Sequence, residues 1–236
     1  MKLNLISNGN TNAKTIKNEA ETYILYLSPL NLNDSGKNVC PFASKGCGEA
    51  CLNSAGRGAF SNVQKARRRK TNLFFDDPNL FFTQLLSDLS KINGKAVKEK
   101  KTIFVRLNGT SDLDFDKLLV RYTGNGLISF GALKFYDYTK DKNKAKNFAR
   151  YNENDKYRVT YSRKETDADD EIKTLLSYGV NVAVVFANEL PNSYLGYNVI
   201  NGDETDLRYN DPSGVIVGLK AKGKAKKDCS GFVVLS

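Results

Sequence analysis

Short apolar runs alternate with polar, helix-forming stretches through the second half of this 236-residue chain, and this alternation constrains the fold more than any other feature. The five runs are TIFVRLN (102–108), LKFYDYT (133–139), YRVTYS (157–162), VNVAVVF (180–186) and GVIVGLK (214–220). Runs of this length that alternate with helices indicate βα units and a largely parallel sheet. The last helical stretch, DADDEIKTLLSYG, ends at Gly179, a typical helix terminator. We therefore expect a single α/β domain over residues 1–236.

The first part of the chain divides into three segments. Residues 1–37 are expected to form short N-terminal strands, of which TYILYLSP is the clearest, and residues 38–58 form a cysteine-rich loop. The βα units occupy residues 59–236, beginning with two helices. Ser61 is a candidate N-cap for the first helix, and Asp77-Pro78 ends it and starts the second.

The amino-acid composition indicates a folded protein that does not span a membrane. An apolar fraction of 40%, with 13 Phe and 12 Tyr, is enough for a hydrophobic core. No apolar run approaches the length of a membrane span, and the polar N-terminal residues do not resemble a signal peptide. We expect a cytoplasmic protein with reduced thiols and no membrane partner. The oligomeric state does not follow from the sequence.

The chain contains no histidine, which removes the commonest general base and the commonest metal ligand. Ser–His–Asp and Cys–His hydrolases, HExxH proteases and Cys2His2 zinc fingers are all excluded. Any chemistry must use cysteine, carboxylate, lysine, tyrosine, arginine or a cofactor.

Three of the four cysteines, Cys40, Cys47 and Cys51, follow a C-x6-C-x3-C pattern, and Cys229 stands far away. Inert core thiols would be unusually clustered in a segment rich in Gly, Ser and Lys. Disulfides conflict with the expected compartment. Structural zinc prefers paired C-x2-C knuckles and would need Cys229 as a fourth ligand. An iron–sulfur cluster fits three thiolates on one compact loop and leaves one iron open for a substrate or cofactor. The spacing alone leaves these alternatives open.

The stretches CPFASKGCGEACLNSAGRG, ARRRKTNLFF and VRLNGTSDLDF resemble the phage "gene product 88" family, over nearly the whole chain. The order of SKGCGEAC, NGTSDLDF and YDYTK is also similar to that of phage radical-S-adenosylmethionine-like proteins. This resemblance implies a complete or partial TIM-like (βα) barrel. It also implies a four-iron, four-sulfur cluster on the three clustered cysteines, S-adenosylmethionine as cofactor, and a location in the infected host cell. The chain departs from that pattern in its last cysteine gap, which is three residues rather than two, and in lacking a Gly-Gly-Glu-type motif.

In a βα barrel, functional residues collect at the C-terminal ends of the strands. At these ends we predict catalytic residues Asp112, Tyr138 and Lys140. We predict cofactor-binding residues Arg106, Asn108, Thr110, Ser111, Tyr161 and Ser162. The competing interpretation is that NGTSD only turns the chain, with Asp112 capping the next helix, and that the tyrosines of YDYTK pack in the core.

A net charge of +10, from 36 basic and 26 acidic residues, favours polyanionic partners. Candidate nucleic-acid contacts are Arg67, Arg68, Lys220, Lys222 and Lys224, although solvated surfaces would look the same. Two segments imitate known loops without their chemistry. The stretch 218–225 lacks the hydroxyl of a phosphate-binding loop, and the acidic stretch 201–211 lacks EF-hand spacing.

Together these features predict a phage-type iron–sulfur protein, a radical-S-adenosylmethionine-like enzyme acting on a nucleotide, nucleic acid or other polar substrate. The alternative is a non-enzymatic nucleic-acid-binding protein with zinc held by Cys40, Cys47, Cys51 and Cys229. A third possibility is a binding protein with plain thiols.

Overall fold

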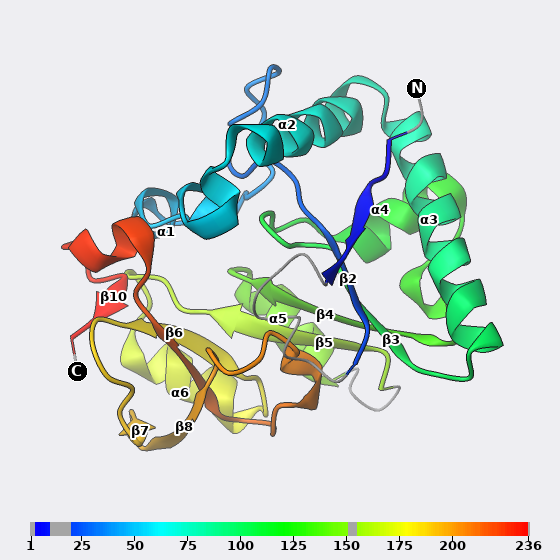
Figure 1. Cartoon of the computed structure of the whole chain (residues 1–236). Helices are drawn as coiled ribbons and strands as arrows, with labels where there is room; N and C mark the ends of the chain where they lie inside the picture. The colour runs from blue at the N-terminus through cyan, green and yellow to red at the C-terminus, as the bar shows by residue number, and fades with distance from the viewer. Residues whose placement is uncertain (1–2, 10–19, 151–154, 236) are drawn as a thin grey trace.

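A computed structural model describes residues 3–9, 20–150 and 155–235 (Figure 1). Within them ten strands form one sheet, accompanied by six α-helices and short 3-10 turns. The strands are β1 (Ile6–Asn8), β2 (Thr22–Leu25), β3 (Ile103–Arg106), β4 (Leu133–Thr139), β5 (Tyr157–Ser162), β6 (Val182–Phe186), β7 (Ser193–Tyr194), β8 (Tyr197–Asn201), β9 (Ile216–Lys220) and β10 (Val233–Val234). The helices are α1 (Lys45–Glu49), α2 (Ser61–Asp76), α3 (Pro78–Lys98), α4 (Phe115–Thr123), α5 (Lys142–Arg150) and α6 (Asp169–Ser177).

The sheet is mixed and open, in the order β1-β2-β3-β4-β5-β6-β9-β8-β7. Strands β2 to β6 are parallel and adjacent in chain order, and β9 and β8 continue the parallel set. β10 pairs in parallel with the end of β6. A closed barrel, one form of our expectation, is wrong. The outermost strands β1 and β7 pair antiparallel with their inner neighbours and not with each other, so the sheet does not close on itself.

The predicted strands are found where the apolar runs lie, and β4 and β5 have the predicted bounds. The break between α2 and α3 is also confirmed. Asp77 caps α3 by accepting a hydrogen bond from the Leu80 N–H at 2.9 Å, and Pro78 is the first helical residue. Ser61 is not the N-cap of α2. Phe60 occupies that position, and Ser61 is the first residue of the helix.

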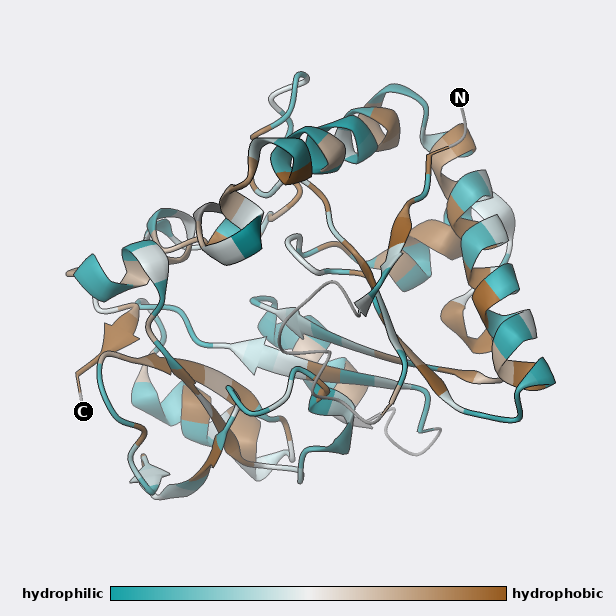
Figure 2. Ribbon diagram, in the orientation of Figure 1, coloured by the Kyte–Doolittle hydropathy of each residue, from teal (hydrophilic) through white to brown (hydrophobic). Residues whose placement is uncertain are grey.

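The hydrophobic core lies on both faces of the sheet (Figure 2). On one face, α3 and α4 supply a large aromatic cluster in which Phe82 stacks on Tyr122, with ring centroids 4.7 Å apart. On the other face, a small cluster packs around Phe104 and Tyr136. None of the described helices is long and apolar enough to cross a membrane.

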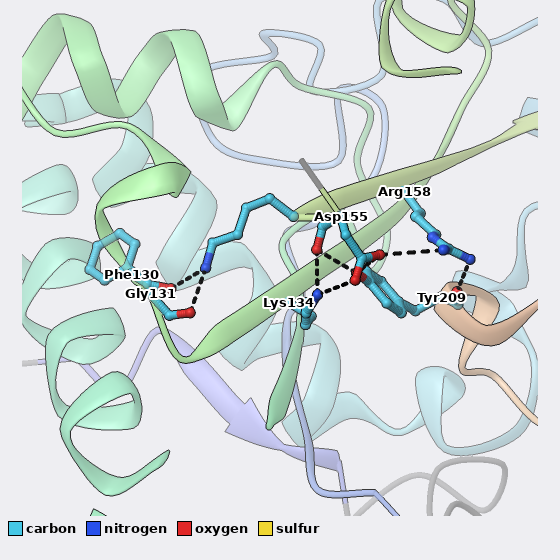
Figure 3. Close-up of polar contacts among 7 residues, drawn as sticks. Phe130, Gly131, Lys134, Asp155, Arg158 and Tyr209 are labelled. Atoms are coloured by element: carbon cyan, nitrogen blue, oxygen red, sulfur yellow. Dashed lines mark hydrogen bonds and ion pairs between the residues drawn. The ribbon is translucent and has the colours of Figure 1, made fainter. Parts of the chain in front are cut away.

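A charged network covers the N-terminal ends of β4 and β5 (Figure 3). Lys134 Nζ donates to the Asp155 main-chain oxygen at 2.6 Å, and Arg158 donates to the Tyr209 oxygen at 2.6 Å. The Tyr209 hydroxyl also donates to Asp155. These contacts attach the 3-10 turn η6 (Arg208–Asn210) to the amino-terminal ends of β4 and β5. The opposite, carboxyl end of the strands carries the cavity described below.

Candidate functional site

A cavity of about 280 Å³ lies at the carboxyl ends of the parallel strands, and Cys40, Cys47 and Cys51 all line it. The cysteine loop thus faces the strand ends. The other predicted residues that line the cavity are Arg106, Asn108, Thr110, Ser111, Asp112, Tyr138, Lys140, Ser162, Lys220 and Lys222. The structure therefore brings together residues that lie up to 182 positions apart, from Cys40 to Lys222.

The cysteine loop is fixed in place by Glu165, which follows β5. The Glu165 carboxylate accepts hydrogen bonds from the Gly46 N–H at 2.8 Å and from the Ser44 hydroxyl at 2.5 Å. Ser44 also caps α1 by accepting from the Cys47 N–H at 3.3 Å. Gly46 lies so close to the C-terminal segment that a Cβ there would stand 2.7 Å from the Phe232 Cβ. The position of Cys47 is thus set by long-range contacts.

Burial disfavours the thiolate form of Cys40 and Cys47. Burial raises the pKa of Cys40 to about 12, the hydrogen bond from the Leu30 N–H to its sulfur at 3.5 Å lowers it, and the negative charges of Cys51 and Cys47 raise it further. Burial also raises the pKa of Cys47, and the nearby Lys140 cation opposes this shift. A neutral thiol is a poor nucleophile, so thiolate catalysis by the free side chains is disfavoured. A bound metal deprotonates its thiol ligands outright.

The cysteines are the candidate metal ligands of this cavity. All four cysteines are free thiols, and Cys229 is exposed and does not line the cavity. Among the described residues, no group of three or more Cys, Asp or Glu side chains is arranged to hold one metal ion. A single zinc needs its sulfurs about 3.8 Å apart, given tetrahedral Zn–S bonds of about 2.3 Å. In an iron–sulfur cluster each thiolate binds its own iron, so the sulfurs stand farther apart. The described side chains thus form no single-ion site, and three thiols that line one cavity are the ligand type of an iron–sulfur cluster.

Lys140 places a buried positive charge beside the cysteines. Its side chain donates to the Ser162 hydroxyl at 3.0 Å and to the main-chain oxygens of Ser162 and Arg163. Burial lowers its pKa, and it forms no ion pair within the described parts of the chain. Asp112 accepts from the Lys140 N–H and the Thr139 hydroxyl, both at 2.8 Å, and burial raises its pKa. Asp112 therefore joins the β3 loop to the end of β4.

The NGTSD segment is a tightly bonded turn. The Asn108 side chain accepts from the Ser111 hydroxyl and the Leu113 N–H, both at 2.9 Å, and donates to Leu113 and to Asp137. The Thr110 hydroxyl donates to the Leu27 oxygen. These side chains already have partners, so they shape the cavity wall, in agreement with the turn interpretation.

An ion pair that the sequence analysis missed forms another wall. Arg106 Nη1 lies 3.1 Å from Asp206 Oδ2, and the guanidinium lies over the Tyr138 ring, 4.8 Å from its centroid. Arg106 Nε is buried and has no hydrogen-bond partner among the described residues. Asp203, nearby in the cavity lining, accepts from Lys222 Nζ at 2.6 Å. Both aspartates belong to the acidic stretch 201–211, whose composition was the only available signal.

Four predicted residues lie outside the cavity lining. Tyr161 is buried on the helix-covered side, where its hydroxyl donates to Asp167 at 2.7 Å, so it is not placed to bind a cofactor in this cavity. Arg67 turns inward over the Tyr26 ring, whereas Arg68 is exposed, 3.8 Å from Asp34. Lys224 is exposed on the 3-10 turn η7 (Gly223–Lys227).

Comparison with known proteins gave one family. Searches of curated proteins and of solved structures found no match. A family description named Gene product 88 matches residues 4–234. Because this match spans almost the whole sequence, including the cysteine loop and every strand of the sheet, the chain belongs to the Gene product 88 family.

Proposed function

We propose that this protein binds a four-iron, four-sulfur cluster through Cys40, Cys47 and Cys51 and is a radical-S-adenosylmethionine-like enzyme acting on a polar substrate. One observation carries the proposal: three thiols from one short loop line a single cavity at the carboxyl ends of a parallel sheet. Ligands of open parallel sheets bind at this edge.

The chain's own residues suit such a cluster. The Leu30 N–H already points at the Cys40 sulfur, and hydrogen bonds of this kind tune a cluster's potential. The Glu165 contacts hold the loop before any cluster binds. The Lys140 ammonium would offset the negative charge of a thiolate-bound cluster. When bound, such a cluster supplies one electron for reductive cleavage of the S-adenosylmethionine sulfonium.

The strand ends would hold the ligand. The Arg106 guanidinium is a cation for a carboxylate or phosphate, and Asp203 and Asp206 are acceptors for an ammonium or hydroxyl group. Asp112 and Lys140 hold the strand ends that line the cavity together through their contacts with Thr139 and Ser162. The zinc alternative receives less support, because Cys229 does not line the cavity.

The test is anaerobic purification followed by iron, sulfide and zinc analysis and an absorbance spectrum. We expect a brown protein with about four iron and four sulfide per chain. Single Cys→Ser changes at positions 40, 47 and 51 should remove the cluster, and the matched control Cys229→Ser should retain it. A colourless protein with about one zinc would overturn the proposal.

The reaction class needs a second assay. The reduced, iron-loaded protein is incubated with S-adenosylmethionine, and 5′-deoxyadenosine is measured by liquid chromatography. Its formation supports the radical assignment. An intact cluster without cleavage would overturn that assignment while leaving cluster binding in place.

A further inference from the structure

We propose that the rim of the cysteine cavity binds single-stranded nucleic acid and presents one unpaired base to the cavity. This names the substrate class of the proposed function and rests on it, because the cavity is where the cluster would act.

The positive charge is concentrated in two segments. Residues 41–72 contain seven basic residues and one acidic residue, and residues 220–227 contain five basic residues and no acidic one. These segments carry a net charge of +11, against +10 for the whole chain, so the rest of the chain carries −1. A charge that served only solubility would be spread over the whole surface.

The fold brings these two segments together beside the cavity. η7 packs against the 3-10 turn η2 (Leu52–Ser54), and a Cβ at Gly223 would stand 2.9 Å from the Ala55 Cβ. Figure 1 shows η7, in red, next to α1, with α2 continuing away from them. The exposed basic residues of these two segments are Lys45, Arg57, Lys65, Arg68, Arg69, Lys220, Lys222, Lys224, Lys226 and Lys227.

The mouth of the cavity combines charge with apolar surface. Lys222 and Leu52 both line the cavity and are both exposed, Leu52 to 60%. Phe60, which precedes α2 and lies outside the cavity lining, is also 59% exposed. Phosphates contact lysines without regard to sequence, whereas unpaired bases stack on aromatic and apolar side chains. A duplex keeps its bases inside, so this combination favours a single strand.

The size of the cavity limits what enters it. At about 280 Å³ it lies near the lower end of small-molecule sites, so a strand does not fit inside it. The strand would therefore lie along the rim while one base turns inward, as in enzymes that modify bases. The Arg106 guanidinium and the aspartates of the wall line the same cavity and would meet the polar edge of that base.

The experiment measures binding of a fluorescein-labelled oligothymidylate of about 16 nucleotides by fluorescence anisotropy. The test variant is Lys224→Glu/Lys226→Glu/Lys227→Glu. The matched control is Lys91→Glu/Lys98→Glu/Lys146→Glu, which changes the net charge equally with exposed residues of α3 and α5. We expect the rim variant to weaken binding by about tenfold or more and to flatten the salt dependence, and the control to change affinity less than about threefold.

Three results would overturn the proposal: no binding at about 50 mM salt, equal losses in both variants, or tighter binding of a duplex of the same length. A photoreactive thymine in the oligonucleotide should crosslink to peptides from 41–72 or 220–227, and crosslinks confined to other peptides would also contradict it. The two proposals fail separately. If the anaerobically purified protein contains iron but binds no strand, this inference alone is refuted. If that protein binds the strand but contains no iron, the proposed function alone is refuted.

Discussion

Replacing Gly46 by alanine should loosen the cysteine loop, and the cost follows from the structure. The new Cβ would stand 2.4 Å from Ser230 Oγ, 2.7 Å from the Phe232 Cβ and 3.0 Å from Glu165 Cδ. The Phe232 Cβ is fixed to the backbone and cannot turn aside. Overpacking of this kind costs about 1–3 kcal/mol. Gly48, in the same short helix, provides the control, because a Cβ there meets only Leu30 Cδ1 at 3.5 Å, an ordinary contact.

Both alanines gain helix propensity, at most about 1 kcal/mol each, so the difference between the variants isolates the steric term. We expect Gly46→Ala to be less stable than Gly48→Ala by about 1–3 kcal/mol, which corresponds to a factor of about 5 to 150 in the opening equilibrium of the loop. The assay combines urea unfolding with the rate of thiol labelling of the reduced, metal-free protein. A Cys229→Ser background removes the exposed thiol. Equal unfolding free energies and equal labelling rates would refute the described packing of α1.

Three further changes test other contacts. Asp206→Asn should lower the free energy of unfolding, measured in thermal melts, by about 3 kcal/mol, because it leaves the Arg106 cation buried without its carboxylate. A loss below about 0.5 kcal/mol would show that the pair is solvated. Lys70→Met tests a pH dependence: burial lowers the pKa of Lys70 from 10.5 to about 8, so the folded state binds fewer protons than the unfolded state between these values. The wild type should therefore gain up to about 3 kcal/mol relative to Lys70→Met as the pH rises through this window, and urea midpoints that stay parallel would contradict it. Glu165→Gln should increase the rate of thiol labelling several-fold, because it weakens two hydrogen bonds to the cysteine loop, each worth about 1 kcal/mol. An unchanged labelling rate would show that other contacts hold the cysteine loop.

Much of the fold could be predicted because the central parallel strands are buried on both faces and read as continuous apolar runs. β3 and β6 are examples. The short strands β7 and β8 contain polar residues and were missed. Whether the sheet closes depends on pairing between its two ends, which no local pattern records. The gene product 88 resemblance is confirmed by the match over residues 4–234, and the radical-enzyme resemblance stays a prediction.

In the site, too, some residues could be predicted from the sequence and others depended on the tertiary structure. Tyr161 and Ser162 are consecutive in β5, so their side chains point to opposite faces and only one could reach the cavity. The register of the sheet places Ser162, and not Tyr161, in the lining of the cavity. Asn108 was predicted to bind a cofactor, but its amide is used within its own turn. Asp206 was missed because it lies in an insertion between β8 and β9 whose path depends on packing.

The sequence by itself determined the chemistry that this protein has at its disposal: thiols without histidine, a run of parallel strands, and positive charge concentrated in two segments. These are properties of residue type and local order, which the chain carries before it folds. Only the tertiary structure decided that the cysteine loop faces the strand ends and that the two basic segments meet beside it. Those juxtapositions join residues far apart in the chain, and long-range contacts such as those of Glu165 with the cysteine loop establish them.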